Sequence, residues 1–175
     1  ELVVVHDRNL LRLAGIDRNV PDMPWEALQR VRISGERIPL LSEVLETIGP
    51  DCYLDIEVKG PRRSSVQLAT ALSALVRAKN LERRVLFSSF QPLLLLPLRK
   101  RSTAPIALVY DGARQPSEVL WDAMKPGPVA SARMRRKPHS LPWIAWTIAR
   151  RERARELLDV GAEGLISDDP GQLGL

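Results

Sequence analysis

Short apolar segments alternate with segments of helical periodicity along most of this chain, and this alternation constrains the fold more than any other feature. Six segments have the apolar or alternating pattern of β-strands: 52–59, 85–90, 106–110, 128–131, 143–148 and 164–168. The apolar stripe from Leu68 to Val76 has the spacing of one helix face. Strands that alternate with helices are typical of α/β proteins with a parallel sheet.

Two other segments also have helical periodicity. An apolar stripe from Leu41 to Ile48 is followed by Gly49, a natural helix stop. The segment 150–160 is densely charged on one side, apolar on the other, and ends at Gly161. Such charged faces are typical of helices that form the outer ring of a barrel.

The number of strand and helix units limits the architecture. A closed (β/α)8 barrel needs eight units and about 250 residues, whereas six units are visible in these 175 residues. We therefore expect a TIM (β/α)8 barrel that is incomplete, with the first two barrel strands and the first helix missing. The short connection at 132–142 indicates either a degenerate helix or residues missing near 125–140. Since no linker or repeat is visible, residues 1–175 are expected to form a single domain.

Composition excludes several classes of protein. With 45% hydrophobic and 27% charged residues, the chain has the composition of a globular protein, and no apolar run approaches the length of a membrane-spanning helix. The single Cys52 excludes an intramolecular disulfide framework and a cysteine-rich zinc module, so a cytoplasmic location is the default expectation, although an upstream signal peptide would not be visible here.

The net charge of +5 is concentrated in part in the basic segment 133–137. Such a segment can bind nucleic acid, anionic lipid or a phosphorylated substrate. The segment contains no aromatic residues that could stack on bases, and no nucleic-acid-binding motif is recognisable in the sequence. We therefore expect no nucleic-acid partner, and a basic anion-binding module is the least favoured interpretation.

Charged side chains gather at the ends of two strand-like segments. His6 and Asp7 follow the apolar segment Leu2–Val5, and Glu57 and Lys59 lie on the polar face of another strand. If these ends meet, one site holds an imidazole for proton transfer, carboxylates for a divalent cation, and a lysine for anionic oxygen. This set suits phosphoryl chemistry. Spacing alone favours a turn or surface feature for His6 and Asp7, and it also allows a cross-strand charge pair on an exposed face for Glu57 and Lys59.

Six sequence pieces occur in an order and at a spacing that resemble the glycerophosphodiester phosphodiesterase family. They are VVVHDRNLLR, IPLLSEVLE, LDIEVK, LFSSF, AWTIA and GAEGLISDDP. The family pattern H-D-x-x-L-x-R is met by His6, Asp7, Leu10 and Arg12, and the pattern I-E-x-K by Ile56, Glu57 and Lys59. The short patterns S-F and W-T are met by Ser89 and Phe90 and by Trp146 and Thr147. The closing pattern G-x-x-x-D-x-P is met by Gly164, Asp168 and Pro170. The resemblance covers nearly the whole chain and is weakest at 111–140.

The resemblance implies a TIM-barrel enzyme that uses a divalent cation, magnesium or calcium, to hydrolyse glycerophosphodiesters to glycerol 3-phosphate and an alcohol. It also implies roles for five residues. His6 would be one of two general acid/base histidines, Glu57 a metal ligand, and Lys59 a partner of the substrate phosphate. Phe90 and Trp146 would bind substrate by lining the barrel mouth.

The chain also departs from the family pattern. The family's His-Arg-Gly strand, Pro-Glu-Asn-Thr segment and Glu-x-Asp strand are absent from this sequence. In the family, the first strand supplies the second histidine and the last supplies two metal ligands. We expect them in roughly 60–80 residues upstream, with Leu2–Val5 as one arm of a hairpin beside the Glu-x-Asp strand. The alternative is a catalytically inactive barrel relative that binds a ligand or a partner. Without the upstream part, we expect no measurable turnover.

Overall fold

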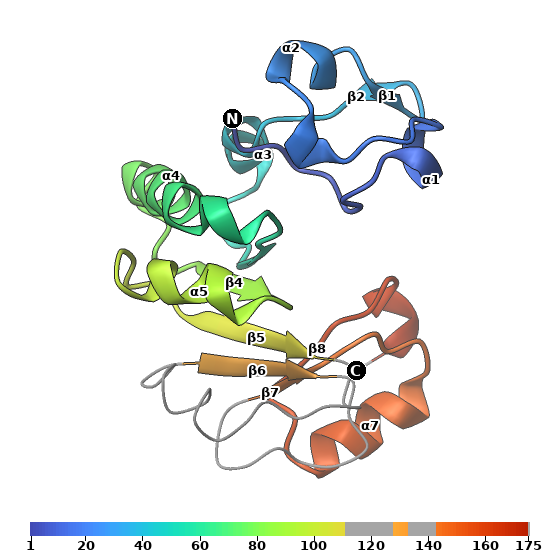
Figure 1. Cartoon of the computed structure of the whole chain (residues 1–175). Helices are drawn as coiled ribbons and strands as arrows, with labels where there is room; N and C mark the ends of the chain where they lie inside the picture. Colours follow the sequence, from blue (N-terminus) through green and yellow to red (C-terminus); the bar gives the residue numbers. More distant parts are fainter. Residues whose placement is uncertain (111–127, 133–142, 175) are drawn as a thin grey trace.

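A six-stranded parallel sheet forms the centre of the protein (Figure 1). The computed structural model describes residues 1–110, 128–132 and 143–174. The strands pair in the order in which they occur in the chain: β3 (Leu54–Glu57), β4 (Val85–Ser89), β5 (Ile106–Tyr110), β6 (Pro128–Ala132), β7 (Trp143–Ala145) and β8 (Gly164–Leu165). This consecutive order is that of a (β/α)-barrel wall and differs from the reversed order of a doubly wound sheet. The α/β class and all six predicted strand segments are confirmed.

Helices cover the outside of this sheet. The predicted helices are confirmed as α3 (Leu41–Thr47), α4 (Ser65–Ala78) and α7 (Arg151–Asp159). The chain turns out of α7 at Gly161, whose φ of 91° is a conformation that glycine adopts without strain. Two short 3-10 helices, η2 (Arg62–Ser64) and η3 (Pro170–Leu173), lie in the part of the chain that forms the sheet and its helices. In the part of the chain that the structure describes, no helix has the length and apolar character needed to cross a membrane.

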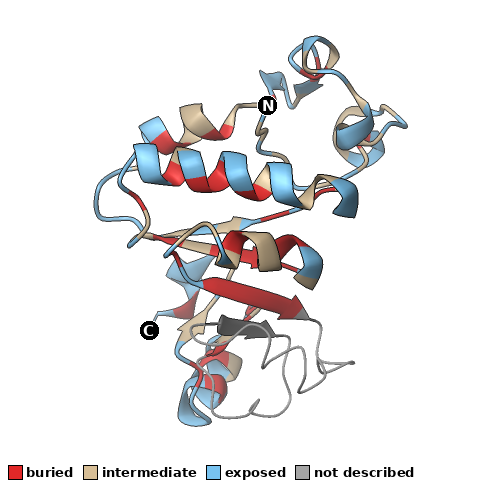
Figure 2. Ribbon diagram, turned by 60° about the vertical axis from the view of Figure 1, so that its left-hand side comes forward, coloured by how far each residue is buried: buried red, intermediate tan, exposed pale blue. Residues whose placement is uncertain are grey.

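Sequence periodicity did not predict helix α5 (Pro92–Arg99). Its apolar run has no regular polar face, so no periodicity distinguishes it from a buried strand. Pro92 begins the helix at a position where the missing N–H costs nothing. Leu95 and Leu98 are fully buried against the sheet, in the same core as Phe87 of β4. Figure 2 shows this buried layer between α4, α5 and the strands.

The packing of α5 gives a stability prediction. Replacement of Leu95, which is 0% exposed, with alanine removes buried methyl groups and leaves a cavity, so we expect the free energy of unfolding to fall by about 2–5 kcal/mol. Leu93 lies on the same helix but is 45% exposed, and Leu93→Ala should change stability by about 0.5 kcal/mol or less. Urea denaturation of both variants measures the difference. Equal effects would contradict the assigned packing of α5.

Residues 1–40 form a separate layer, which we call the amino-terminal unit, beside α3 and above the carboxyl ends of the first strands (Figure 1). It contains α1 (Leu11–Ala14), η1 (Val20–Asp22), α2 (Trp25–Leu28) and a hairpin of β1 (Arg32–Ile33) and β2 (Glu36–Arg37). These elements enclose a second, smaller core formed by Leu10, Leu28, Val31 and Ile38. A unit of such short elements has too few turns of helix for periodicity to reveal it.

The segment Leu2–Val5 pairs only weakly within the described residues, and its pairing with an upstream Glu-x-Asp strand stays a prediction. This segment is extended but forms only an isolated antiparallel bridge, between Val3 and Leu40. The Val4 N–H donates to the Pro39 carbonyl at 2.9 Å. Val3 and Val5 pack against the second core, whereas Val4 between them is 40% exposed, so the segment alternates like a strand with one face inward. Its partner in the described residues is therefore the segment that leads into α3.

The start of α3 is held by an ion pair with the hairpin. Glu43 accepts hydrogen bonds from the Leu40 N–H at 2.8 Å and from Arg37 Nη1 at 2.8 Å. The Arg37 guanidinium, and next the Leu40 N–H, lower the pKa of Glu43 from 4.5 to about 2. Since the folded carboxylate resists protonation, its stabilising contribution is complete above pH 4.5 and is lost as the pH falls toward 2.

This depressed pKa predicts a difference in acid denaturation. In Glu43→Gln the side chain no longer titrates, so the fall in unfolding free energy between pH 4.5 and about 2 should be less steep than in the wild type. Arg37→Gln removes the same ion pair from the other side and should give a smaller flattening, because the Leu40 N–H still lowers the pKa of Glu43. Urea midpoints measured across this pH range test both variants. Curves parallel to the wild type would contradict the ion-pair assignment.

Candidate active site

His6 lies in a tightly bonded loop of the amino-terminal unit. Leu10 anchors this loop because its side chain is fully buried in the second core. The Val20 N–H donates to the Arg8 carbonyl at 2.8 Å, and the Asn9 side chain accepts from the Leu11 N–H at 2.8 Å. These bonds fix the backbone that carries the H-D-x-x-L-x-R pattern.

Three side chains of the pattern form a continuous chain of hydrogen bonds. The His6 ring nitrogen Nδ1 lies 2.6 Å from Asp7 Oδ1. The Arg12 guanidinium donates to both oxygens of the same carboxylate, from Nε at 2.7 Å and from Nη2 at 2.8 Å. Arg12 and then His6 hold the pKa of Asp7 well below its ordinary value, and the Asp7 carboxylate raises the pKa of Arg12. Asp7 is therefore ionised at neutral pH.

Lys59 connects this loop to the carboxyl end of β3. Its Nζ lies 3.0 Å from Glu57 Oε2 and donates to the His6 carbonyl at 2.9 Å. The structure thus brings together His6, Glu57 and Lys59, which lie on two separate segments of the sequence. It also shows that Glu57 and Lys59 form an ion pair along one strand end.

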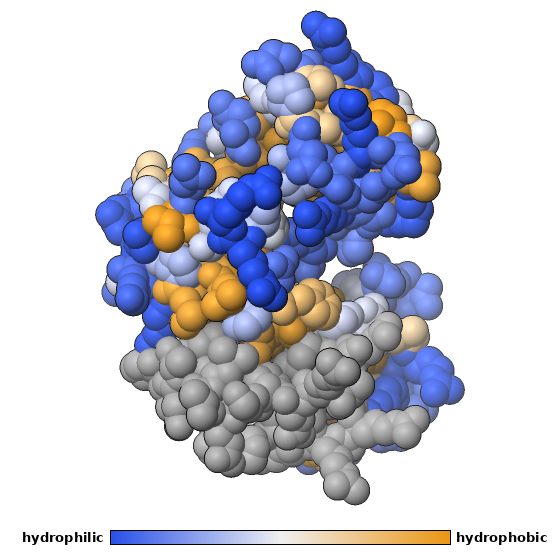
Figure 3. All heavy atoms as spheres, in the orientation of Figure 1, coloured by the Kyte–Doolittle hydropathy of each residue, from blue (hydrophilic) through white to orange (hydrophobic). Residues whose placement is uncertain are grey.

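A cavity of about 570 Å³ opens at this junction. Its lining residues come from the His6 loop and from the end of β3: His6, Asp7, Arg8, Asn9, Leu11, Arg12 and Lys59. Figure 3 shows the surface hollowed below the amino-terminal unit, with hydrophilic residues along the upper wall. The lining carries three cationic side chains and the one carboxylate of Asp7, so its balance of charge is positive and favours anionic groups.

The buried side chain of Ser89 links the ends of β3 and β4 by hydrogen bonds. It is 1% exposed, and its Oγ donates to the Val58 carbonyl at 2.7 Å and accepts from the Gln91 N–H at 3.0 Å. Because Val58 lies between Glu57 and Lys59, this bond fixes the backbone that carries these two side chains. The role of Ser89 was not predicted from the sequence, although the S-F pattern contains it.

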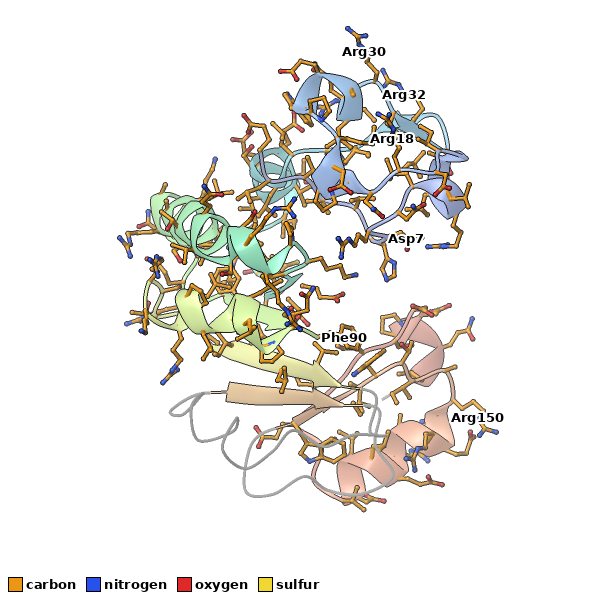
Figure 4. All side chains as sticks on the ribbon, viewed as in Figure 1. Asp7, Arg18, Arg30, Arg32, Phe90 and Arg150 are labelled. Atoms are coloured by element: carbon orange, nitrogen blue, oxygen red, sulfur yellow. The ribbon has the colours of Figure 1, made fainter. Side chains whose placement is uncertain are left out.

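Phe90 and Trp146 lie together near the carboxyl ends of β4 and β7. Their rings meet edge to face with centroids 5.5 Å apart and planes at 85°, and the Trp146–Thr147 peptide bond is cis. Phe90 is 49% exposed. Figure 4 shows it across the hollow from Asp7. The pair therefore lies opposite the loop that carries His6, rather than in the cavity wall formed by that loop.

The carboxylates of β3 indicate what kind of ion the site can hold. Asp55 retains contact with solvent, but the surrounding protein removes part of its hydration and so raises its pKa. A hydrogen bond with Ser88 acts in the opposite direction, and the negative charge of Glu57 raises the pKa further. Carboxylate oxygens are the ligands that Mg²⁺ and Ca²⁺ prefer, so Glu57 fits such an ion by its chemistry. Among the described residues, no group of three or more His, Cys, Asp or Glu side chains could hold a metal ion.

A parallel sheet in barrel order, with catalytic-type side chains at the carboxyl ends of its strands, defines the class of (β/α)-barrel proteins. Within this class, the chain belongs to the glycerophosphoryl diester phosphodiesterase family, because the sequence model of that family matches residues 1–172. The resemblance inferred from the sequence pieces is therefore confirmed. Members of this family are phosphoric diester hydrolases.

Individual relatives agree with this family. A glycerophosphodiester phosphodiesterase of Caldanaerobacter subterraneus is 28% identical in an alignment of 190 positions that covers 98% of this chain and 78% of that protein. The structure of an Oleispira antarctica phosphodiesterase in complex with the product sn-glycerol-3-phosphate has a TM-score of 0.81 at 19% identity, covering 98% of this chain and 77% of that one. The structure of a glycerophosphodiester phosphodiesterase from Agrobacterium tumefaciens has a TM-score of 0.74 at 19% identity, and the match covers 99% of this chain and 80% of that one. At this identity, the structures support the fold alone.

The basic segment 133–137 lies outside the described residues, as does most of the connection 132–142.

Proposed function

We propose that the full-length protein hydrolyses glycerophosphodiesters to glycerol 3-phosphate and an alcohol, with the assistance of a divalent cation. The observation that carries this proposal is that Lys59 contacts both Glu57 and the His6 backbone beside one cavity, in a chain of this family. The product named in the Oleispira antarctica complex is consistent with this substrate class.

Each residue has a distinct role in the proposed reaction. Water attacks phosphorus, the bond from phosphorus to the alcohol oxygen breaks, and one proton is removed from water while another reaches the departing alcohol. His6 is a general acid/base group for these transfers. Lys59 offsets the charge of the non-bridging oxygens, and a preorganised cation is most effective where charge develops.

Glu57 is proposed as a ligand of the divalent cation, either magnesium or calcium. When bound, such an ion polarises a phosphoryl oxygen and neutralises developing negative charge. The Lys59 ammonium, 3.0 Å from Glu57, would then be placed to contact the same phosphate group. Phe90 and Trp146 are proposed to line the opposite side of the substrate site, where their apolar surfaces reduce water contact and strengthen nearby charge interactions.

We further propose that residues 1–175 belong to one barrel domain whose wall is completed by two strands outside this sequence. Within the described residues, β3 and β8 are the two end strands of the sheet. An open barrel wall leaves unpaired backbone groups and core side chains exposed at those edges, which further strands would cover. The upstream sequence tests this directly: it should contain His-Arg followed by Glu-x-Asp.

Chelation tests the proposed function. The full-length protein should hydrolyse glycerophosphocholine and bis-nitrophenyl phosphate, and EDTA should lower both rates at least about 100-fold, because the cation supplies several kcal/mol of charge stabilisation. Excess magnesium or calcium should restore the activity. Hydrolysis that is indifferent to EDTA would contradict the role proposed for Glu57.

A further inference from the structure

The H-D-x-x-L-x-R pattern contains two charged residues that the proposed reaction does not use. His6 carries the proton and Leu10 anchors the loop, but Asp7 and Arg12 have no chemical step. We propose that Asp7 and Arg12 are positioning residues that hold the His6 ring with the proton on Nδ1, so that Nε2 is the atom that exchanges protons with the substrate. This inference rests on the proposed acid/base role of His6.

The first step of the argument is the direction of the hydrogen bond. Asp7 Oδ1 lies 2.6 Å from Nδ1, and an ionised carboxylate can only accept. Nδ1 must therefore carry the hydrogen, which leaves Nε2 of the neutral ring with its lone pair. In a neutral imidazole the partner of one nitrogen sets the state of the other.

The second step is the ionisation of Asp7. Arg12 contacts both of its oxygens, and this two-point contact between planar groups fixes the carboxylate in orientation as well as in charge. The Asp7 side chain is 19% exposed, whereas those of His6 and Arg12 are 78% and 69% exposed. Asp7 is thus covered between its two partners, and its lowered pKa keeps it an acceptor.

The third step is the fixed backbone beneath the ring. Lys59 donates to the His6 carbonyl at 2.9 Å, and Leu10 anchors the other end of the loop in the second core. The ring is consequently held at Nδ1 by Asp7 and at its backbone by Lys59. When Nε2 takes a proton, the Asp7 carboxylate stabilises the resulting imidazolium, in the manner of the aspartate in a Ser-His-Asp triad.

The ring state can be observed without any enzyme activity. The chain has two histidines, so a long-range ¹H–¹⁵N spectrum of the imidazoles, compared with that of His139→Gln, assigns His6. At a pH where the ring is neutral, we expect Nδ1 of His6 to be protonated. In Asp7→Asn the amide oxygen faces Arg12 and the amide N–H faces the ring, so the proton should move to Nε2. A wild-type ring protonated at Nε2, or a spectrum unchanged in Asp7→Asn, would overturn the proposal.

Kinetics of the full-length protein give the second readout. Asp7→Asn should lower kcat and kcat/KM together by about 10²- to 10⁴-fold, because the contact acts in the transition state. Arg12→Gln should lower kcat up to about 100-fold by loosening the carboxylate, and Arg12→Lys should restore only part of it. The matched control is Arg18→Gln, which removes an exposed arginine of the same unit (Figure 4). This control should leave kcat nearly unchanged.

The two measurements separate this inference from the proposed function. If His6→Ala retains full activity while the wild-type ring is protonated at Nδ1, the proposed function fails and the geometry stands. If His6→Ala is inactive but Asp7→Asn retains the wild-type kcat, the positioning role fails and the proposed function stands.

Discussion

Replacement of His6 with alanine is expected to lower kcat for glycerophosphodiester hydrolysis by about 10²- to 10⁴-fold in the full-length protein, the range typical of a general acid/base group. The physical reason is that one proton transfer loses its positioned carrier and must use water. His6 is 78% exposed at the side chain, so its removal leaves no buried cavity. Steady-state rates with glycerophosphocholine measure the effect, and urea denaturation checks that the fold is unchanged.

His139→Ala is the matched control for this variant, because it removes the only other histidine in the sequence. Its kcat should remain within about twofold of the wild type. Equal losses in the two variants, or no loss in His6→Ala, would contradict the role of His6 in proton transfer.

The second large effect is expected for Glu57→Gln. The amide is nearly the same size as the carboxylate but carries no charge, so it binds a divalent cation weakly and leaves Lys59 without its 3.0 Å ion-pair partner. We expect kcat at a fixed low cation concentration to fall at least about 100-fold. The cation concentration for half-maximal activity should rise about 10- to 100-fold, as measured by titration of the chelated enzyme.

Glu46→Gln is the control for Glu57→Gln. Glu46 forms a similar exposed ion pair with Lys79, at 2.8 Å, on the outer surface of the protein. Loss of this pair should change stability by about 1 kcal/mol or less and leave the cation dependence unchanged. A cation titration that is the same in Glu57→Gln as in the wild type would show that Glu57 is not a ligand.

The sequence predicted the sheet of this protein better than the part that carries His6. The strands β3 to β8 are short apolar segments bounded by turns, and the strict alternation around Leu54–Glu57 places its polar residues on one face. The helix α5 was missed because its run of leucines has no polar face. The amino-terminal unit was missed because its helices have one turn each and are stabilised by a small core of residues distant in sequence.

The site itself could be predicted only in part. Spacing alone allowed a surface turn at His6 and an isolated charge pair at Glu57, and the family resemblance indicated that the two belong together. The bond from Lys59 to the His6 carbonyl is a contact between segments far apart in sequence, so no local pattern encodes it. The positioning roles proposed for Asp7 and Arg12 rest on the geometry of the loop, because the H-D-x-x-L-x-R pattern gives the two residues but not their contacts.

The most direct test of the proposed function is ³¹P NMR of glycerophosphocholine incubated with the full-length protein and either magnesium or calcium. We expect the diester signal to be replaced by that of glycerol 3-phosphate, and His6→Ala to leave the diester intact over the same period. A persistent diester signal with the wild-type protein across a panel of glycerophosphodiesters, or a product other than glycerol 3-phosphate, would contradict the proposed function.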